Sequence, residues 1–217
     1  TTVIAGLTTT QVAGLTADQL GGLTTTQFGA LSTTGLGALT ATQVGGLSTA
    51  SVGSLGTTNL QALSTTQLAG LKETQIAGLS TANLAALTTT QVAALSAKQL
   101  AALTTAQVNT LTTTTLGAIT STQIKSLEVA DIAALSTASL AALSSTQVAG
   151  LTAAQLTGLT TAQVAALKTD QIVAVESSDL QALTTAQLVA IETTDIAELT
   201  TRQLSTLATS TVAALST

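Results

Sequence analysis

Acidic side chains are the residues of this chain most able to do chemistry, and they occur in three pairs with a spacing of three residues. The pairs are Glu128 and Asp131, Glu176 and Asp179, and Glu192 and Asp195. Carboxylate oxygens are ligands for hard cations such as Ca²⁺. Successive layers of the fold could bring the later acids together. The sequence then predicts a weak cation site made by Glu176, Asp179, Glu192, Asp195 and Glu198.

A structural interpretation of the same acids is simpler. Carboxylates near the N-terminus of a helix interact favourably with the helix dipole, and they keep the surface soluble. The chain also has no D-x-D loop with the ligand spacing of calcium-binding loops. We therefore favour the structural interpretation and predict that the chain binds no metal ion.

Catalytic residue types are scarce. The chain contains no histidine and no cysteine, which removes the most frequent general base, the most frequent metal ligand and any disulfide or zinc–thiolate site. The serine residues therefore lack a base, and Lys98 lacks a Ser-Lys motif around it. No glycine-rich phosphate loop is present in the sequence. These absences predict a protein that is not an enzyme and holds no cofactor.

Charge and hydropathy restrict the expected partners. Ten acidic and five basic residues give a net charge of −5, whereas nucleic-acid binding needs clustered Lys and Arg. Base stacking needs aromatic side chains, and Phe28 is the only one. A membrane span needs about 20 apolar residues in succession, but runs such as Ile172–Val175 are the longest. We expect neither nucleic-acid binding nor a membrane span.

An eight-residue period organises the whole chain. Leu, Ile or Val occupies every eighth residue from Leu7 to Leu215, 27 times without an insertion. When the octad is numbered from this residue, position 2 is Thr or Ser in 19 of 26 complete octads, and position 5 is Gln in 16. Position 6 is always apolar, and position 8 is mostly Ala or Gly. So strict a short period predicts a solenoid in which each unit repeats the same contacts with its neighbours.

Each octad carries the pattern of a helix start. In the octad that begins at Leu87, Thr88 is the expected N-cap and Gln91 the third helical residue, which together form a capping box. Leu87 and Val92 occupy the two positions of a hydrophobic staple. Because the next cap, Ser96, follows so soon, each helix must stop near position 8, where Gly or Ala allows a tight bend. We therefore predict an all-α solenoid of very short capped helices, one per octad.

Two other folds fit the period less well. In one continuous helix the Leu stripe would shift by about 80° per octad and leave no single buried face. A β-solenoid is the alternative fold, because Thr and Val favour strands and short repeats suit β-helices. However, positions 1 and 6 have opposite parity, so a flat strand would direct them to opposite faces.

The residue type at position 6 indicates how many octads form one layer. In the first 15 octads, β-branched residues occupy six of the eight odd-numbered octads but only one of the seven even-numbered ones, at Val52. The phase reverses from the sixteenth octad onward, and the acidic pairs are separated by multiples of 16 residues. These alternations predict two octads per layer, each layer being a pair of short antiparallel helices.

The period is not interrupted by a linker, so we expect residues 1–217 to form a single continuous repeat array. Glycine is concentrated in the first part of the chain, and charge in the last part. Neither end carries the polar capping unit that solenoids usually have. We therefore expect the ends to be cut from a longer assembly or to continue into one.

The run L-[ST]-x-x-Q-[VLI]-x-[AG], as in Leu87–Ala94 and Leu159–Ala166, resembles the low-complexity repeat regions of very long bacterial surface and secreted proteins. This resemblance covers the entire chain. It implies an exported, extended structural element, located outside the cell or on its surface, such as a filament subunit or a stalk segment. Its expected partners are copies of itself, arranged end to end or laterally. The absence of cysteine is consistent with export but does not demonstrate it.

Thr and Ser at positions 3 and 4 form regular rows that we expect to be exposed. Such rows suggest an alternative function as a surface-binding module for ice or glycans, and they are possible sites of O-linked glycans. A solvated face of a Thr-rich repeat explains the rows more simply. Thr mixes freely with Ala and Ser at these positions, which a lattice-matching surface would resist.

Overall fold

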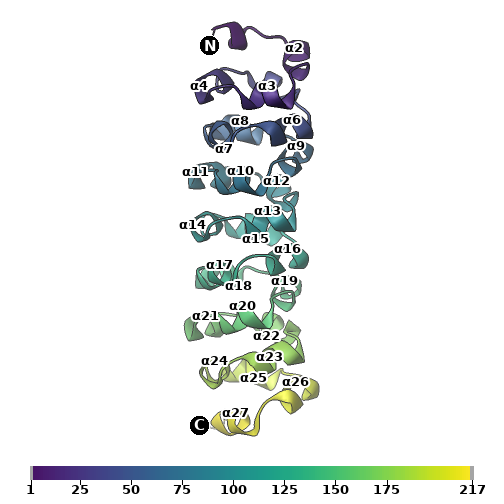
Figure 1. Ribbon diagram of the computed structural model, residues 1–217. Helices are drawn as coiled ribbons and strands as arrows, with labels where there is room; N and C mark the ends of the chain where they lie inside the picture. Colours follow the sequence, from purple (N-terminus) through teal and green to yellow (C-terminus); the bar gives the residue numbers. More distant parts are fainter. Residues whose placement is uncertain (1, 216–217) are drawn as a thin grey trace. The chain divides into compact units, whose positions relative to one another are not determined.

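The computed structural model describes residues 2–215, and this range contains 27 short α-helices and no β-strand (Figure 1). The helices are α1 Thr2–Ala5, α2 Thr9–Ala13, α3 Ala17–Gly21, α4 Thr25–Phe28, α5 Thr33–Gly37, α6 Ala41–Gly46, α7 Thr49–Gly53, α8 Thr57–Gln61, α9 Thr65–Ala69, α10 Glu73–Ala77, α11 Thr81–Ala85, α12 Thr89–Ala93, α13 Ala97–Ala101, α14 Thr105–Val108, α15 Thr113–Ala118, α16 Ser121–Lys125, α17 Val129–Ala133, α18 Thr137–Ala141, α19 Ser145–Ala149, α20 Ala153–Thr157, α21 Thr161–Ala165, α22 Thr169–Ala174, α23 Ser177–Ala182, α24 Thr185–Val189, α25 Thr193–Ala197, α26 Thr201–Thr206 and α27 Thr209–Ala214. The all-α prediction is confirmed, and the β-solenoid alternative is wrong.

Local capping explains where each helix begins. Thr88 has an extended backbone, and its side chain accepts a hydrogen bond from the backbone N–H of Gln91 at 3.2 Å. The Gln91 Oε1 atom in turn accepts from the backbone N–H of Thr88 at 3.0 Å. The predicted capping box is therefore present, and the same arrangement recurs in octads with Thr or Ser at position 2 and Gln at position 5, as at Thr40 and Thr160.

The helices end near the predicted position, but glycine has a different role there from the predicted tight bend. Most helices end at position 7 of the octad, and no residue in the range 2–215 has a positive φ. Glycine is therefore not required for a left-handed turn. A Cβ atom on Gly46 would lie 2.5 Å from the Cβ atom of Ala17, and one on Gly70 would lie 2.5 Å from the carbonyl oxygen of Ala41. At these positions glycine permits close contact between successive turns of the solenoid.

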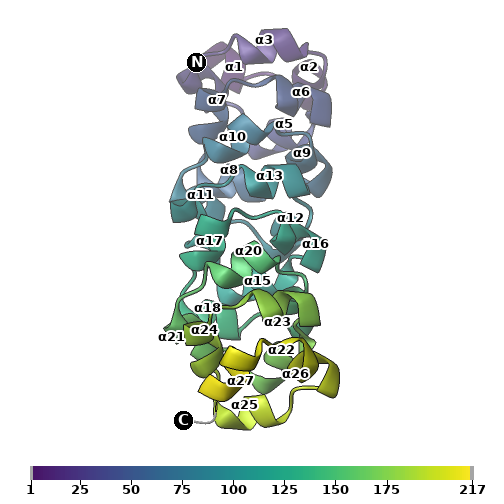
Figure 2. The same ribbon diagram turned by 60° about the horizontal axis from the view of Figure 1, so that its bottom comes forward.

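The chain divides into two compact units, Thr1–Leu111 and Thr112–Thr217. In the first unit, α3 packs on α6 and α6 on α9; in the second, α16 packs on α19 and α19 on α22. The main helix contacts within each unit all join helices three apart in the chain, so one turn contains three octads (Figure 2). That residues 1–217 form a single continuous array stays a prediction.

The prediction of two octads per layer is therefore wrong. It depended on the alternation of β-branched residues and Leu at position 6, but both types fill the same buried space. Val92 and Leu100, on adjacent octads, are each 0% exposed. Since Val, Ile and Leu side chains satisfy the same packing requirement, their alternation carries no information about the number of octads in a turn.

The core of each unit is made by the two apolar positions of the octad. Position 6 is almost completely buried in the interior turns, as at Leu68 and Val148, and position 1 is nearly as well buried, as at Leu95 and Leu151. Both residues of each hydrophobic staple thus face the interior. The remaining positions lie on the outside or in the contacts between turns, and any site must be built from them.

Candidate functional site

Position 5 is the most connected polar position of the octad. The Gln91 side chain is 4% exposed and uses both ends of its amide. While Oε1 caps α12, Nε2 donates to the carbonyl oxygens of Leu60 at 3.1 Å and Leu63 at 2.8 Å. Leu60 lies in α8 and Leu63 in the loop that follows it, and both belong to the preceding turn. One side chain therefore starts its own helix and joins its turn to the turn before it.

The same bond recurs within both units. Gln67 donates to the carbonyls of Leu36 and Leu39, each at 2.8 Å. In the second unit, Gln147 donates to the carbonyls of Leu116 and Ile119, each at 2.7 Å. In both cases the acceptors lie 31 and 28 residues before the glutamine. Buried carbonyl groups need donors, and each glutamine supplies one to the position 1 carbonyl in the loop. Its second acceptor, such as Leu36, lies in the last turn of a helix and also accepts from a backbone N–H.

The sequence pattern predicts only the capping role of this glutamine. A capping box accepts Glu as readily as Gln, yet position 5 is Gln in 16 complete octads and Glu in none. That preference was the available signal for the second role, since only the amide can donate to a carbonyl while its oxygen caps the helix.

Aspartate replaces this glutamine at Asp131, Asp179 and Asp195. An ionised carboxylate cannot donate, so these octads must be joined differently. Asp195 is 5% exposed, and its Oδ1 atom accepts from the hydroxyl of Thr169 at 2.6 Å. Asp131 is 2% exposed, and its Oδ2 atom accepts from the backbone N–H of Glu128 at 3.3 Å. Two of the three aspartates are thus buried structural groups.

The structure does not bring the predicted cation ligands together. Glu176 and Asp179 belong to the octad of α23, which packs on α20 and α26, whereas Glu192 and Asp195 belong to the octad of α25, which packs on α22. With three octads per turn, acids 16 residues apart do not stack. No group of three acidic side chains in the range 2–215 is arranged to hold a metal ion.

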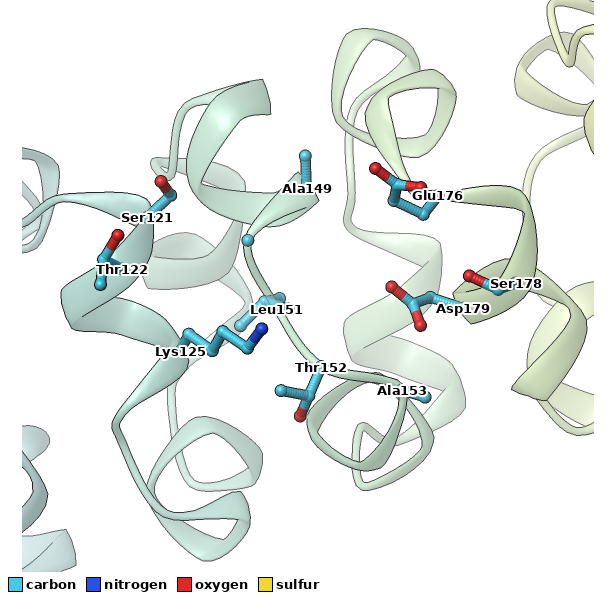
Figure 3. A pocket seen from close by; sticks show the side chains of 11 residues that line it. Ser121, Thr122, Lys125, Ala149, Leu151, Thr152, Ala153, Glu176, Ser178 and Asp179 are labelled. Atoms are coloured by element: carbon cyan, nitrogen blue, oxygen red, sulfur yellow. The ribbon is translucent and has the colours of Figure 1, made fainter.

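A groove lies beside Asp179, the remaining aspartate that replaces a position 5 glutamine. It is lined by Ser121, Thr122, Lys125, Ala149, Gly150, Leu151, Thr152, Ala153, Glu176, Ser178 and Asp179. Figure 3 shows the carboxylates of Glu176 and Asp179 on one side of the groove and the ammonium group of Lys125 on the other. By the spacing that Gln67 and Gln147 use, a glutamine at residue 179 would donate to the carbonyls of Val148 and Leu151. Asp179 instead places a carboxylate at this contact between turns, where it lines the groove.

The groove combines charged and hydroxyl side chains. Its two serines, Ser121 and Ser178, have no histidine beside them, because the chain contains none. A second groove shares Glu176 and Ser178 with the first and includes Arg202. Both are open surface features with exposed charges of either sign.

Repeated turns, a two-row apolar core and a buried glutamine that joins one turn to the next define a helical repeat protein of the solenoid class. The model of the ALTTAQ repeat matches residues 18–49, 76–113, 124–161, 150–177 and 172–209, which together are more than half of the chain. The chain therefore belongs to the ALTTAQ repeat family. The sequence ALTTAQ itself occurs at Ala102–Gln107 and Ala182–Gln187, and its last residue is the glutamine of position 5.

No curated protein matches the chain. The family match supports a repeat region along the chain.

Proposed function

We propose that this protein is a structural element of the cell exterior, either the subunit of an extracellular filament or a segment of a stalk, without catalytic activity. The bond of the position 5 glutamine to the preceding turn carries this proposal. Gln67, Gln91 and Gln147 make it with nearly identical distances. A fold whose turns use the same contacts can be lengthened without redesign, because each turn contacts only its neighbours.

The use of the buried polar residues supports the same function. In an enzyme or a ligand-binding protein, some buried polar groups are kept for the ligand. Here the side chains of buried glutamines such as Gln67 form helix caps and hydrogen bonds between turns, and Asp195 accepts a hydrogen bond from Thr169. No buried side-chain polar atom in the described part of the chain lacks a partner. None of the described helices has the length and apolarity needed to cross a bilayer.

Two experiments test this proposal separately: one changes the number of turns, and the other asks whether the protein lies outside the cell. Deletion of one complete turn, residues 71–94, should shorten the purified protein while keeping its helical content, whereas deletion of residues 71–86 removes two octads and should shift every later contact out of register. Small-angle X-ray scattering and circular dichroism report the two outcomes. Protease treatment of intact producing cells should remove the protein; complete protection, with lysed cells as the positive control, would contradict an exterior location.

A second candidate function is a surface-binding module, and the exposure of the Thr rows favours it. Thr57 and Thr58 in α8, and Thr113 and Thr114 in α15, are all exposed. Ice binding would appear as thermal hysteresis, and glycan binding as retention on a glycan array. Mass spectrometry of protein isolated from its natural source would detect O-linked glycans on the same hydroxyls. Loss of ice or glycan binding in a variant with Ala at exposed Thr positions would establish this function in place of a purely structural one.

A further inference from the structure

One threonine per turn forms a row within each of the two units. The first Thr row consists of the opening residues of α2, α5, α8 and α11, which are Thr9, Thr33, Thr57 and Thr81. The second Thr row consists of the opening residues of α15, α18, α21 and α24, which are Thr113, Thr137, Thr161 and Thr185. Within each unit these helices stack in that order, so successive threonines of a row belong to successive turns.

The three-octad turn sorts a position that is irregular in the linear sequence. Along the chain, position 3 changes between Thr, Ala, Ser and other residues, which is unlike a regular surface. Helices on the other sides of the units account for that mixture, since they begin at residues such as Glu73, Ala97 and Val129. Each of the two rows contains Thr without exception.

The row threonines have no role in holding the fold. All eight are exposed, although a further turn of the same unit stacks on each of their helices. Their hydroxyl groups have no hydrogen-bond partner among the described residues. The caps are made at positions 2 and 5 and the core at positions 1 and 6, so the fold does not require Thr at position 3. Ala17 and Ala41, at the same position elsewhere, are half-buried and lie against Gly46 and Gly70.

Charge is excluded from the octads that carry the rows. The chain has ten acidic and five basic residues, and none of them lies in these eight octads. The charges of the first unit, such as Asp18 and Lys98, and those of the second, such as Lys125 and Arg202, belong to helices outside the rows. Covering a charged group without a partner is costly. An uncharged partner can therefore cover a Thr row without desolvating any charge of that row.

The geometry of a row favours a linear partner. Each hydroxyl can donate one hydrogen bond and accept others, and it repeats once per turn. Position 4, beside the row, is not uniform, since it changes from Thr58 to Ala82 in the first unit and from Thr114 to Ala138 in the second. The surface is thus regular in one direction only. A crystal face such as ice needs regularity in two directions, whereas an extended chain needs it in one.

We propose that the Thr rows bind an extended, uncharged polysaccharide chain through its hydroxyl groups. An acidic polysaccharide would need basic side chains, which the rows lack, and the net charge of −5 would repel it. This inference deepens the surface-binding alternative of the proposed function, and it rests on an exterior location where such chains occur. It names the ligand class and the residues of the surface.

Binding should depend strongly on the length of the polysaccharide. The chain has no exposed aromatic side chain on which a sugar ring could stack, because Phe28 is its only aromatic residue and is 0% exposed. Each threonine therefore contributes a weak contact, and one polymer gains from binding several of them at once. Oligosaccharides of up to about six sugars should need concentrations at least ~100-fold higher than the parent polymer, in sugar units, to compete for the protein.

Affinity electrophoresis of the purified chain tests the proposal. Native gels are cast with one neutral polysaccharide each: mixed-linkage β-glucan, galactomannan, dextran or pullulan. These polymers do not move in the field, so a protein that binds one of them is retarded relative to a gel without polysaccharide. An unrelated acidic protein in the same gel corrects for viscosity. At least one neutral polymer should retard the wild type, and polygalacturonate, an acidic polymer, should not.

Substitution of the rows assigns the binding to their hydroxyl groups. The row variant carries Val, which has nearly the shape of Thr, at Thr33, Thr57, Thr81, Thr137, Thr161 and Thr185, and it should lose the retardation. Ser at the same six positions keeps the hydroxyls and should keep the retardation. The matched control carries Val at six exposed threonines outside the rows, three in each unit, and should behave like the wild type; these are Thr26, Thr49, Thr74, Thr122, Thr146 and Thr194. Circular dichroism checks that every variant keeps the wild-type helical content.

Three results would overturn the proposal. They are a wild type that none of the four neutral polymers retards, equal retardation by polygalacturonate, and a row variant retarded as strongly as the wild type. Thermal hysteresis that the row variant loses, without retardation by any polymer, would assign the rows to ice instead.

The location test fails or succeeds independently of these results. A protein that protease removes from intact cells, but that no polymer retards, would refute this inference and leave a structural function outside the cell. A protein protected inside the cell, but retarded through its rows, would refute the exterior location and leave the Thr rows as a polysaccharide-binding surface.

Discussion

The octads of α13 and α23 have the same length and the same apolar positions, but their contacts with the preceding turn differ. In α13, Gln99 is 2% exposed and donates to the carbonyls of Leu68 and Leu71 at 2.8 and 2.7 Å. In α23, Asp179 occupies the same octad position, and a groove with charged walls lies there instead. The apolar core continues through both, since Leu100 and Leu180 are each 0% exposed.

This comparison separates two contributions to the contact between turns. Apolar packing is common to both octads and keeps the turns together. The amide bonds are present in one octad and absent in the other. A groove lies beside Asp179, and a second groove lies beside Gln203, which does make its amide bonds. Four substitutions test this separation.

The largest effect should come from the shared apolar core. Val92→Asp places a carboxylate where the wild-type side chain is 0% exposed and should lower the free energy of unfolding by about 3–5 kcal/mol, because the charge is buried without a partner. Urea denaturation measures the change. The control Val129→Asp, at a residue 39% exposed, should cost less than about 1 kcal/mol. Equal stabilities of Val92→Asp and the wild type would mean that position 6 is not core.

Removal of an amide donor should have the next largest effect. Gln99→Glu keeps an oxygen for the cap but loses both bonds to Leu68 and Leu71, so the expected loss of stability is about 2–3 kcal/mol. Thr90→Glu adds the same charge at an exposed residue of α12 and serves as the control. Hydrogen exchange should increase in the loop around Leu71 in Gln99→Glu alone. A loss no greater than that of the control would show that the amide contributes only to the cap.

The reverse change should supply the missing amide bonds. Asp179→Gln supplies an amide at the spacing used by Gln147 and should raise the free energy of unfolding by about 1 kcal/mol. The control Glu176→Gln removes a charge from the same groove without supplying a donor at position 5, and it should have a smaller effect. If both variants are stabilised equally, charge relief and not the amide bond explains the gain.

The smallest effect should come from the charge across the groove. Lys125 is exposed, and exposed charges near one another contribute little. Lys125→Met should therefore change the free energy of unfolding by less than about 0.5 kcal/mol. A loss of more than about 1 kcal/mol in thermal or urea unfolding would show that the groove is held by its charges, contrary to the comparison with α13.

Much of the fold could be predicted from residues close together in the sequence. The caps at Thr88 and its equivalents, the staple residues Leu87 and Val92, and the single helix per octad all depend on residues at most a few positions apart. The candidate cation site could not be judged in the same way. Its assembly required acids of different octads to stack, and the number of octads per turn decides which octads stack.

The acids also show why a plausible set of ligands is not gathered in one place. Asp195 was a candidate ligand by type, but its carboxylate accepts from Thr169, 26 residues earlier in the chain. Of the three aspartates, Asp179 is the one that lines this groove. Glu176, its partner in the sequence pattern, lines the same groove and is exposed. Only the stacked turns distinguish a buried structural carboxylate from one that lines the surface.

The sequence alone determined one short capped helix per octad, with positions 1 and 6 as its apolar contacts, because capping and staple interactions join residues three to five apart. The tertiary structure decided the three octads per turn, the close approach at Gly46 and Gly70, and the second bond of each interior glutamine. Those features depend on contacts about 25 to 31 residues apart, as from Gln91 to Leu60 and Leu63. An eight-residue period fixes the contacts within one octad but leaves open how many octads complete a turn, and side-chain packing between turns makes that choice.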